Sequence, residues 1–572
     1  MKNLEIAKIF YEIADILEIQ GVEFKPMSYR KAAKNIESLS EDIEEIWKEG
    51  KLRVIPGVGE NISKKIEEII LTGKLKYFDK LKKKAPMHFE ELMKIPGMGP
   101  KKIKILYQKL KVASIKDLEK AAKKHKLAKL EGMGIKSEED ILRGIELLRK
   151  GKGKILLGYA YPMAKEVVGY LKKSKDVYKI NVAGSLRRMK ETIRDVDILV
   201  ISSKPENVMD YFTKMPLVKD VLAKGKTKST VILENGLQVD VRVVNDREFG
   251  SAMQYFTGSK EHSISLRRIA IKKGLKISEY GVFKKKSGKE RVIARKTEKS
   301  VYGSLGMGYI EPELRENRGE IEAALHKQLP KLIGYGDVLG DLHAHSMYSD
   351  GVDKIEDMAK TAYKLGYKYI CITDHSQSQK IANGLSEKEL LIQGKEIDEL
   401  NKQFKSFKIL KGTEVDIKSD GSLDWPDRIL KSMDVVVASI HSGFKSPNEE
   451  MTKRILKGLD NKYVNIFAHP TGRLINQREP YNVDLEKVYE KAEQNGVCLE
   501  INSFPSRLDL NDGNIKRAKE FNVKFVIDTD AHSVNHLEFM RFGIATARRG
   551  WCEKKDVLNS FKLKDLLKIL KK

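Results

Sequence analysis

The chain has 572 residues, of which 41% are hydrophobic and 33% are charged, and its formal net charge is +27. This length predicts several domains, each able to bury its own core. No run of 18 apolar residues occurs and the amphipathic N-terminus carries acidic residues, which argues against a membrane span and a signal peptide. Three widely spaced cysteines favour a reducing cytoplasm over a disulfide-linked secreted protein.

The positive charge is unevenly distributed along the chain. Lys and Arg exceed Asp and Glu mainly within residues 1–335, whereas residues 336–572 are nearly balanced. A generally Lys-rich composition would not by itself leave the last part balanced. We therefore expect the first three-fifths of the chain to bind a polyanion such as a nucleic acid.

The first 150 residues have the pattern of short amphipathic helices interrupted by a repeated turn. IPGVG at 55–59 and IPGMG at 95–99 each precede a Lys-rich helix. Their glycines permit tight turns whose amides can hold a phosphate: Gly57, Gly59, Gly97 and Gly99. One such turn is usually an ordinary helix connector, but two resemble helix-hairpin-helix motifs that bind the DNA backbone. LEGMG at 130–134 is either a third, degenerate copy or a plain connector, because Glu131 replaces the proline.

The first 80 residues also contain FKPMSYRKAA and GVGENISKKIEE, which resemble the small lyase domain of DNA polymerase beta. The resemblance implies that Lys65 forms a Schiff base with an abasic sugar and that Lys25 and Tyr29 hold a 5′-phosphate. Asn61 and Phe24 stand where the animal enzymes carry a lysine and a histidine, which weakens the match. The alternative is that Lys65 is a surface lysine of a Lys-rich helix.

Three aspartates are expected on one face of two predicted strands. Asp195 and Asp197 alternate in DVDILV, and Asp240 lies in VDVRVV, so period-two geometry turns them away from the apolar face. Carboxylates gathered in this way are costly unless a cation such as Mg²⁺ lies between them. Gly184 and Ser185, after a strand and before a helix, offer amides and a hydroxyl to a phosphate. The pattern predicts a two-metal phosphoryl-transfer site, with solvated strand faces as the plain alternative.

The order GSLRR, DVDILV, VDVRVV and YFTGS resembles the palm of the family X DNA polymerases. The resemblance implies that Asp195 and Asp197 bind two Mg²⁺ or Mn²⁺ ions, and that Asp240 binds the catalytic one and accepts the primer hydroxyl proton. It also implies that Ser185 and Arg188 hold the phosphates of a nucleotide.

The segment after the palm resembles the nucleotide-selecting part of the same family. Two aromatic residues and a glycine would line the incoming nucleotide: Tyr255, Phe256 and Gly258. Lys260 and Ser263 stand where DNA polymerase beta has an aspartate and an asparagine, and Arg267 matches a residue that contacts the template strand. The segment ends in LGMGYIEPELRE, similar to the closing element of bacterial and archaeal family X enzymes.

Residues 341–572 alternate apolar strands with helices, and each strand runs into polar residues. Of the 11 histidines in the chain, six lie at these predicted strand ends. With three carboxylates they make a set of nitrogen and oxygen ligands: His343, His345, Asp350, His375, Glu414, His441, His469, Asp530 and His532. Seven β–α units with function at the strand ends predict a parallel barrel. The ligand set can hold up to three Zn²⁺ or Mn²⁺ ions that hydrolyse a phosphate ester.

The motifs DLHAHS, SDG, TDHS, GTE, IHS, AHP and DTDAHS resemble the polymerase and histidinol phosphatase (PHP) domain. Every ligand of that family is present, which favours an active domain over the structural role that some polymerase subunits retain. Arg507 and Asp509 in SFPSRLDL match a further family segment at the rim of the barrel.

The predicted fold class is multidomain: N-terminal all-α helix-hairpin-helix domains, an α/β nucleotidyltransferase palm with an α+β thumb, and a C-terminal distorted (β/α)7 PHP barrel. The predicted units are a lyase-like domain 1–82, a fingers-like domain 83–150, the palm 151–258, the thumb-like domain 259–330, a linker 331–340 and the PHP domain 341–572.

This combination indicates a family X DNA polymerase that fills short gaps in DNA repair and trims 3′ ends as a 3′→5′ exonuclease, with cleavage at abasic sites as a further expectation. We expect a monomeric, nucleoid-associated enzyme whose substrates are gapped or nicked DNA and dNTPs, and for which a DNA ligase is a fitting repair partner. Two alternatives stay open: a nuclease whose palm only positions DNA, and a polymerase whose barrel is purely structural.

Overall fold

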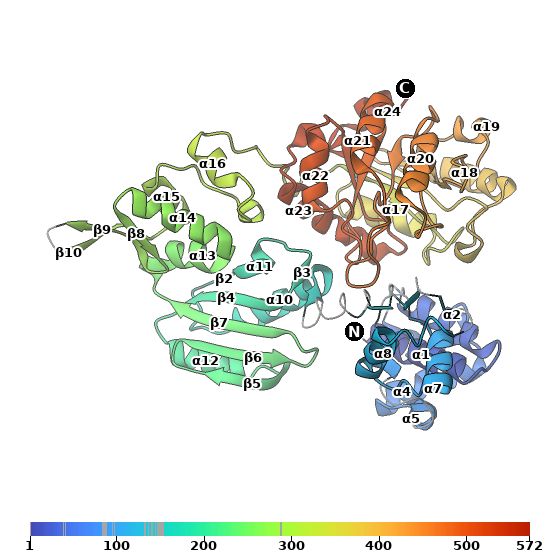
Figure 1. Ribbon diagram of the computed structural model, residues 1–572, viewed down its shortest axis with the longest axis horizontal. Coiled ribbons are helices and arrows are strands. Elements are labelled where there is room, and N and C mark those ends of the chain that lie inside the picture. Colours follow the sequence, from blue (N-terminus) through green and yellow to red (C-terminus); the bar gives the residue numbers. More distant parts are fainter. Residues whose placement is uncertain are drawn as a thin grey trace.

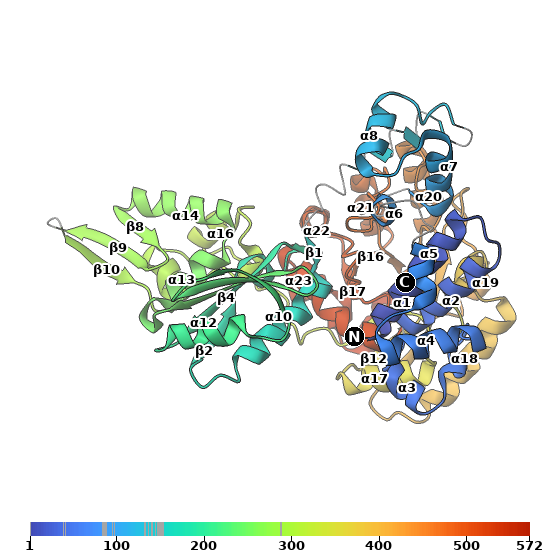
Figure 2. The ribbon, with the colours of Figure 1, turned by 90° about the horizontal axis from the view of Figure 1, so that it is seen from below.

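The computed structural model describes residues 2–571 except 38, 40, 41, 83–88, 94, 96, 97, 131, 132, 135, 136, 139, 140, 143, 144, 146–153, 287 and 288. Three lobes follow one another along the chain: helices α1–α8, then β1–β10 with α10–α16, then β11–β17 with α17–α24 (Figure 1). Figure 2, seen from below, places the first lobe beside the third and far from β8–β10. Within these described ranges, no helix is long and apolar enough to cross a membrane.

The N-terminal lobe is all helical, as predicted. One continuous hydrophobic core runs through it from Ile6 to Ile145, so the predicted units 1–82 and 83–150 share their buried side chains. The Asp42 side chain caps the start of α3, and Gly73, with φ of 68°, ends α4. The helices are α1 Lys2–Ile19, α2 Lys25–Glu37, α3 Ile43–Lys48, α4 Glu60–Thr72, α5 Lys76–Lys82, α6 Phe89–Met93, α7 Pro100–Leu110 and α8 Ile115–Lys123.

A mixed five-stranded sheet in the order β2-β4-β7-β6-β5 forms the centre of the second lobe. Four of its strands coincide with the apolar stretches KINVAG, VDILVI, STVILE and QVDVRVV of the sequence. The fifth, β5, escapes prediction because it is an edge strand with almost every residue exposed and no alternating apolar face. The elements are β2 Lys179–Val182, β4 Asp195–Ile201, β5 Val218–Lys224, β6 Lys228–Leu233, β7 Gln238–Val244, α10 Leu157–Leu171, α11 Gly184–Arg187, α12 Pro205–Thr213 and the short pair β1 Ile155–Leu156 and β3 Thr192–Ile193.

The thumb-like segment combines helices with a small antiparallel sheet, β10-β9-β8. At its base the fully buried Arg315 guanidinium lies 5.2 Å from the Tyr302 ring centroid and 5.4 Å from that of Tyr309. Arg315 and Arg187, the latter from α11, both pair with the carboxylate of Glu298, at 2.7 and 2.6 Å. This network ties the palm to the thumb. The elements are α13 Phe249–Thr257, α14 Lys260–Lys272, β8 Leu275–Ser278, β9 Gly281–Lys286, β10 Lys289–Ala294, α15 Glu298–Ser304 and α16 Glu320–Leu325.

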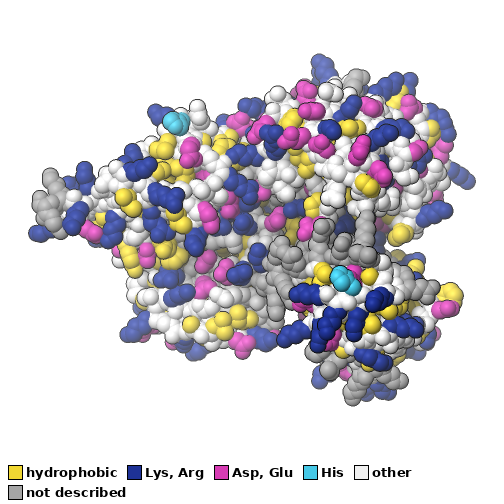
Figure 3. Space-filling view, viewed as in Figure 1, with side chains coloured by type: hydrophobic (Ala, Val, Ile, Leu, Met, Phe, Trp, Pro, Cys, Tyr) yellow, Lys and Arg dark blue, Asp and Glu magenta, His cyan; other side chains and the backbone are white. Residues whose placement is uncertain are grey.

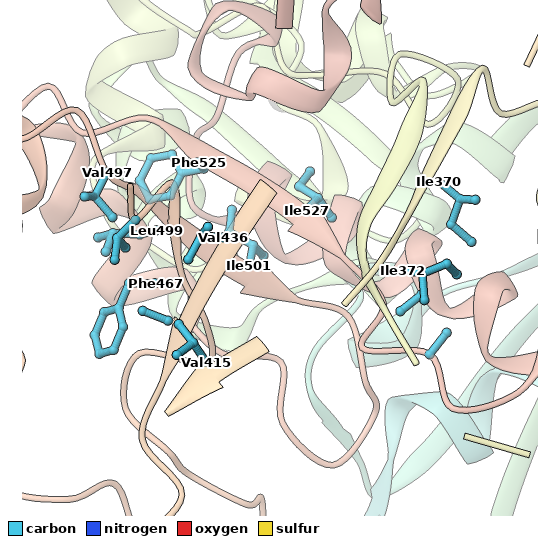
Figure 4. Close-up of a cluster of buried hydrophobic side chains, with 14 of the residues drawn as sticks. Ile370, Ile372, Val415, Val436, Phe467, Val497, Leu499, Ile501, Phe525 and Ile527 are labelled. Atoms are coloured by element: carbon cyan, nitrogen blue, oxygen red, sulfur yellow. The ribbon is translucent and has the colours of Figure 1, made fainter. Parts of the chain in front are cut away.

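The third lobe is the predicted barrel. Its seven strands pair in parallel in chain order, and a bridge between Ala344 and Ala531 connects the first strand with the segment after the last, so the barrel is nearly closed. Side chains such as Ile370, Val436 and Phe525 fill the space between strands and surrounding helices (Figure 4). The strands are β11 Gly340–Ala344, β12 Tyr369–Ile372, β13 Lys408–Asp416, β14 Val435–Ser439, β15 Ile466–Phe467, β16 Cys498–Asn502 and β17 Phe525–Asp528. The helices are α17 Ile355–Lys364, α18 Glu387–Asn401, α19 Asp427–Leu430, α20 Asn448–Leu459, α21 Leu485–Gln494, α22 Asp512–Lys519, α23 Met540–Arg549 and α24 Leu563–Leu570.

The palm and the barrel share buried surface. Leu508 and Phe542 of the barrel belong to the palm's hydrophobic core. Gly158 in α10 approaches the barrel so closely that a Cβ there would lie 2.3 Å from Pro505 Cγ. Arg549 in α23 pairs with Glu316 of the thumb-like segment at 3.0 Å. These contacts hold the palm against one side of the barrel.

Candidate active sites

The palm sheet brings the three predicted aspartates to one face. In β4, Val196 and Ile198 are buried, whereas Asp195 and Asp197, which alternate with them, are half-buried on the opposite face. β7 shows the same alternation around Asp240. Because β4 and β7 pair in parallel with Asp197 opposite Asp240, their carboxylates are cross-strand neighbours.

The electrostatics of this face differ from one aspartate to the next. Burial, together with the nearby negative charges of Asp195 and Asp240, raises the pKa of Asp197 to about 7. Burial alone would also raise the pKa of Asp240, but hydrogen bonds from Thr230 and Gln238 and the charge of Lys228 lower it. The protein thus compensates the charge of Asp197 less than that of Asp240, as expected of a group that awaits a cation.

Lys228, Thr230 and Gln238 are site residues that the sequence analysis missed. Thr230 donates a hydrogen bond of 2.5 Å and Gln238 one of 2.8 Å to the Asp240 carboxylate, and Lys228 Nζ lies 3.1 Å from it. Thr230 is placed there because β6 and β7 pair antiparallel with Thr230 opposite Asp240. The alternating Lys-x-Thr in KSTVIL was the available signal, but only the strand register connects it with Asp240.

Gly184 lies against the same face. With φ of +62°, it opens α11, and a Cβ at this position would lie 2.2 Å from Asp197 Oδ2. Ser185 beside it is half-buried. Arg188 is buried, and its guanidinium pairs with Glu316 at 2.9 Å and donates to the Thr257 carbonyl at 2.5 Å. The structure thus places Arg188 next to the site but already engaged with the thumb-like segment.

Replacing Gly184 with alanine should lower nucleotide incorporation about a hundredfold, because displacement of a metal-binding carboxylate by about 1 Å has effects of that size. The left-handed backbone adds strain for any L side chain. A primer-extension assay on gapped DNA measures the loss. Gly169→Ala is the matched control: Gly169 lies within α10 with no atom within 4 Å of its Cβ position, so this variant should extend primers like the wild type.

The residues predicted to line the nucleotide follow the palm directly. Tyr255 and Phe256 end α13 with their rings edge to face at 5.1 Å, and Gly258 has φ of +69° with its Cβ position 3.1 Å from Arg188 Nη1. Lys260 and Arg267 are exposed on α14. Ser263 is buried, and in the described part of the chain its hydroxyl has no hydrogen-bond partner. Phe256 reaches the palm sheet, because the Arg242 guanidinium of β7 lies 4.8 Å from its ring centroid.

The barrel gathers all nine predicted ligands at the C-terminal ends of its strands. Among the described residues, three groups have ligand atoms within 4.8 Å of one another: His345, Asp350, His375 and His532; His343, His345 and Asp530; and His375, Glu414 and His441. His469 joins them through Glu414, at 3.2 Å from Nε2 to Oε1. Within the described residues the palm holds no such group, and its Asp240 carboxylate is turned towards Lys228 and Thr230.

His345 and His375 each belong to two of the groups, and Glu414 lies against imidazoles of all three. Glu414 lies 2.9 Å from His375 Nδ1 and 3.3 Å from His441 Nε2, while Asp350 lies 3.2 Å from His532 Nε2. Burial alone would raise the pKa of Glu414, but His375, His441 and His343 hold it well below its usual range. A carboxylate shared between imidazoles in this way is suited to bridge two cations.

Outer residues orient these ligands. His343 Nδ1 pairs with Glu500 at 2.7 Å, and His441 Nδ1 pairs with Asp416 at 2.7 Å. Arg507 Nε lies 3.3 Å from Asp530 Oδ2. Glu500 and Asp416 are supporting residues that no sequence motif indicated, and the pairing of Glu500 with His343 depends on the barrel bringing β11 and β16 together. A carboxylate behind an imidazole fixes the ring and strengthens its free nitrogen as a metal ligand.

The arrangement fits metal ions. His345 Nδ1 is buried without a hydrogen-bond partner in the described part of the chain. Nε2 of His343 and Nε2 of His345 lie 3.2 Å apart, and Asp530 Oδ1 lies 3.8 and 3.4 Å from them, so nitrogen and oxygen ligand atoms converge in one buried place. Buried lone pairs that converge without donors are costly, and a divalent cation among nitrogen and oxygen ligands removes that cost.

The repeated turns of the N-terminal lobe share one backbone hydrogen bond. The amide of Val58 donates to the Ile55 carbonyl, and that of Met98 donates to the Ile95 carbonyl, both at 3.0 Å. Gly59 and Gly99 then occupy the N-cap positions of α4 and α7, and Gly57 has φ of +81°. Gly97 lies outside the described residues. At the third turn, the amide of Met133 donates to the Leu130 carbonyl at 3.0 Å, which is the same hydrogen bond as in the first two.

The predicted lyase residues lie close together. Lys65 Nζ lies 5.0 Å from the Tyr77 ring centroid, and the Tyr29 ring stacks on Tyr77 with centroids 6.4 Å apart. Burial, with a contribution from the nearby charge of Lys25, lowers the pKa of Lys65. Many Lys and Arg side chains cover this lobe (Figure 3). A lysine with a lowered pKa is a better amine nucleophile at neutral pH.

Comparisons with known families match four parts of the chain. Four family models match: a helix-hairpin-helix domain at residues 1–75, a SAM-like helix-hairpin-helix tandem at 89–146, the DNA polymerase beta thumb at 252–316 and the PHP domain at 341–504. The tandem spans both the second and the third turn, which favours the third as a true copy.

Curated relatives extend over the whole chain or over parts of it. The chain is 40% identical over 575 residues to the DNA polymerase/3'-5' exonuclease PolX of Bacillus subtilis (strain 168), with 100% of both chains covered. It is 35% identical over 203 residues to a probable phosphatase of Thermoanaerobacter sp. (strain X514), covering 34% of this chain and 78% of the relative. It is also 26% identical over 343 residues to DNA polymerase lambda of Rattus norvegicus, covering 55% and 56% of the two chains.

The full-length relative, the polymerase thumb and the PHP domain all agree with the resemblance found in the sequence motifs. The predicted fold class is confirmed, from the helical N-terminal lobe to the seven-stranded parallel barrel. The chain therefore belongs to the family X DNA polymerases that carry helix-hairpin-helix domains and a C-terminal PHP domain.

Proposed function

We propose that the chain fills short gaps in DNA during repair and trims the 3′ ends that it extends. As a member of its family it is a DNA-directed DNA polymerase and a metal-dependent phosphoesterase with 3′→5′ exonuclease activity. The observation that carries the proposal is the presence of two separate centres, the aspartate face of the palm and the histidine cluster of the barrel. A trimming centre and a filling centre on one chain allow a damaged end to be removed and replaced.

In the palm, Asp195 and Asp197 would hold two divalent ions and Asp240 would join them at one. When bound, such ions neutralise the charge of the nucleotide phosphates and favour in-line displacement. The protein itself positions the substrates and moves the proton. The amides at the start of α11 and the Ser185 hydroxyl hold the phosphates, and Asp240 accepts the proton of the primer hydroxyl. Gly184 keeps space for the Asp197 carboxylate.

In the barrel, the nine ligands would hold a cluster of up to three ions. When bound, these ions polarise a phosphodiester and activate water for its hydrolysis. Glu500 and Asp416 hold the rings of His343 and His441 in place, and Arg507 at the rim is positioned to attract the DNA backbone. Because the ligands are imidazoles and carboxylates, we propose Zn²⁺ or Mn²⁺ here, and Mg²⁺ or Mn²⁺ at the all-carboxylate palm.

The N-terminal lobe is proposed to bind DNA through its hairpins and to act as a 5′-deoxyribose phosphate lyase through Lys65, with Lys25 and Tyr29 at the phosphate. We keep the division into units 1–82, 83–150, 151–258, 259–330 and 341–572, with 331–340 as the linker, as a proposal. The proposed setting is the cytoplasm, at the nucleoid, with gapped or nicked DNA and dNTPs as substrates for a monomer. Cleavage at abasic sites and hand-over to a DNA ligase complete the proposed pathway.

Lys65→Ala should abolish covalent trapping of the protein on DNA with an incised abasic site in the presence of borohydride, because the Schiff base needs the lysine amine. Lys64→Ala is the matched control, since Lys64 is an exposed neighbour whose amine pairs with Glu60 at 2.8 Å. Trapping should persist in this control. Equal trapping of wild type and Lys65→Ala would show that Lys65 is not the lyase nucleophile.

One experiment tests the two-centre proposal. A duplex with a single-nucleotide gap and a labelled primer is incubated with Mn²⁺, with and without dNTPs, for wild type, Asp195→Ala/Asp197→Ala and His343→Ala/His345→Ala. Extension lost only in the first variant and shortening lost only in the second would support two active centres. A wild type that never extends the primer would favour the alternative of a nuclease with a DNA-positioning palm, and one that never shortens it would favour a structural barrel.

A further inference from the structure

A cavity of about 820 Å³ opens beside the histidine cluster, and three parts of the chain line it. One wall comes from the barrel, including Asp350, Asp530 and His532. Another comes from α1 and α2 of the N-terminal lobe, and the start of α10 in the palm completes it with Tyr159. The volume is in the range of pockets that enclose a ligand of nucleotide size. We call this cavity the three-lobe pocket.

The N-terminal lobe reaches the candidate metal ligands directly. Lys34 in α2 places its Nζ 3.4 Å from Asp350 Oδ2, and this ion pair joins residues 316 positions apart. The Lys34 side chain is half-exposed at 48%, whereas that of Asp350 is 13% exposed. A lysine whose side chain reaches a phosphoesterase centre from the solvent can pair with a phosphate that enters the pocket.

The barrel side of the pocket is aromatic. Phe504 lies edge to face with His536 at 5.1 Å and with Phe539 at 5.4 Å, and His536 stacks on Phe539 at 5.0 Å. Tyr159 faces the same space from the palm and is 55% exposed. Stacking on aromatic side chains is how proteins bind the bases of single strands without reading their sequence.

Two of the three walls are held rigidly together. Gly158, next to Tyr159, leaves no room for a Cβ against Pro505, which itself follows Phe504. Tyr159 of the palm and Phe504 of the barrel are therefore held in fixed positions relative to each other. Positive and negative charges lie on different sides of the pocket. Arg507 lies beside Asp530 on the barrel side, whereas Glu37, which accepts a hydrogen bond from Tyr11, and Asp42 repel phosphate from the N-terminal lobe's own corner. A phosphate is thus directed to the side of Lys34 and Arg507.

We propose that the three-lobe pocket holds the 3′-terminal nucleotide of the strand being trimmed, with its base against Phe504 and Tyr159 and its phosphate contacted by Lys34. This inference rests on the proposed exonuclease function and adds to it that the N-terminal lobe is part of the nuclease site. Lys34 leaves Asp350 for the phosphate when the strand enters. Because stacking tolerates every base, the pocket binds 3′ ends of any sequence.

The first test needs no metal and no turnover. EDTA-treated full-length protein is titrated into single-stranded oligonucleotides that carry 2-aminopurine either at the 3′ end or in the middle, and stacking is followed as fluorescence quenching. Wild type should quench the terminal probe, Phe504→Ala should quench it less, and Lys34→Ala should bind the strand about fivefold more weakly. Lys34→Arg should restore binding. Lys48→Ala, which removes a lysine that pairs only locally with Glu45, should behave as wild type.

The second test separates binding from chemistry. With Mn²⁺, Lys34→Ala should raise the KM for trimming a single strand about fivefold and leave kcat within about twofold, because the lysine positions the strand and the barrel performs the hydrolysis. A rise in kcat/KM would overturn the proposal and identify the N-terminal lobe as a lid. Equal losses in Lys34→Ala and Lys48→Ala, or no quenching at the 3′ end, would also overturn it. Absence of trimming in the wild type would instead refute the proposed nuclease function. The quenching result would still show whether the three-lobe pocket binds a 3′-terminal nucleotide.

Discussion

Nucleotide incorporation should fall at least about a thousandfold when Asp195 and Asp197 are both replaced with alanine, because removing preorganised charge from a phosphoryl-transfer centre has effects of this size. Asp195 and Asp197 share the exposed face of β4, and Asp197 lies opposite Asp240 in the register of β4 and β7. Without them only Asp240 remains, and Lys228, Thr230 and Gln238 already contact its carboxylate. Two ions then have too few ligands to bind.

The fold should survive this change. The substitutions remove charges that repel one another, and because burial raises the pKa of Asp197 to about 7, this carboxyl costs stability at neutral pH, so the metal-free double variant should be more stable than the wild type. Thermal unfolding with EDTA checks this point. Asp220→Ala is the matched control, because Asp220 lies exposed in β5 of the same sheet and should leave extension unchanged. Incorporation by the double variant at a rate near that of wild type would refute the assignment of the palm site.

Trimming of 3′ ends should disappear when His343 and His345 are replaced with alanine, and the purified protein should lose tightly bound metal. Both imidazoles are fully buried, and their Nε2 atoms lie 3.2 Å apart with Asp530 and Glu414 nearby. Their removal deletes two of the proposed direct metal ligands. Even the loss of a residue that only supports a ligand lowers metal affinity about 10- to 100-fold, so the loss of two ligands should lower it further. Nuclease rate and metal content by elemental analysis measure the two effects together.

This variant also carries a structural cost. His343 Nδ1 pairs with Glu500 at 2.7 Å, and removing one partner of a buried ion pair costs about 3–5 kcal/mol. A companion variant avoids the problem: His532 is partly exposed at the rim and pairs with Asp350, so His532→Ala should weaken trimming with a smaller loss of stability. His326→Ala, at an exposed histidine after α16, is the matched control. Retained trimming and retained metal in both cluster variants would show that the barrel has another role.

The two centres are also joined physically. Glu316 binds both Arg188 of the palm and Arg549 of α23, at 2.9 and 3.0 Å, and Arg549 donates to the Arg188 carbonyl at 2.8 Å. If trimming is lost in the palm variant as well as in the cluster variant, this connection explains how the palm delivers the primer to the barrel.

Sequence alone determined the local chemistry of this protein. Alternation in DVDILV and VDVRVV placed the aspartates on one strand face, because side-chain direction in a strand depends only on position. Paired glycines predicted the turns before α4 and α7, because left-handed backbone geometry is a local property. Apolar stretches that each end in a histidine or carboxylate predicted the barrel rim and its nine ligands. These features depend on neighbours along the chain.

Only the tertiary structure decided which distant residues complete each site. Thr230 and Lys228 reach Asp240 through the register of β6 and β7, and Glu500 reaches His343 because β11 and β16 belong to one barrel. The pairing of Lys34 with Asp350 needs two lobes to meet. Such contacts come from packing between segments far apart in sequence, where the periodicity of either segment carries no information about the other.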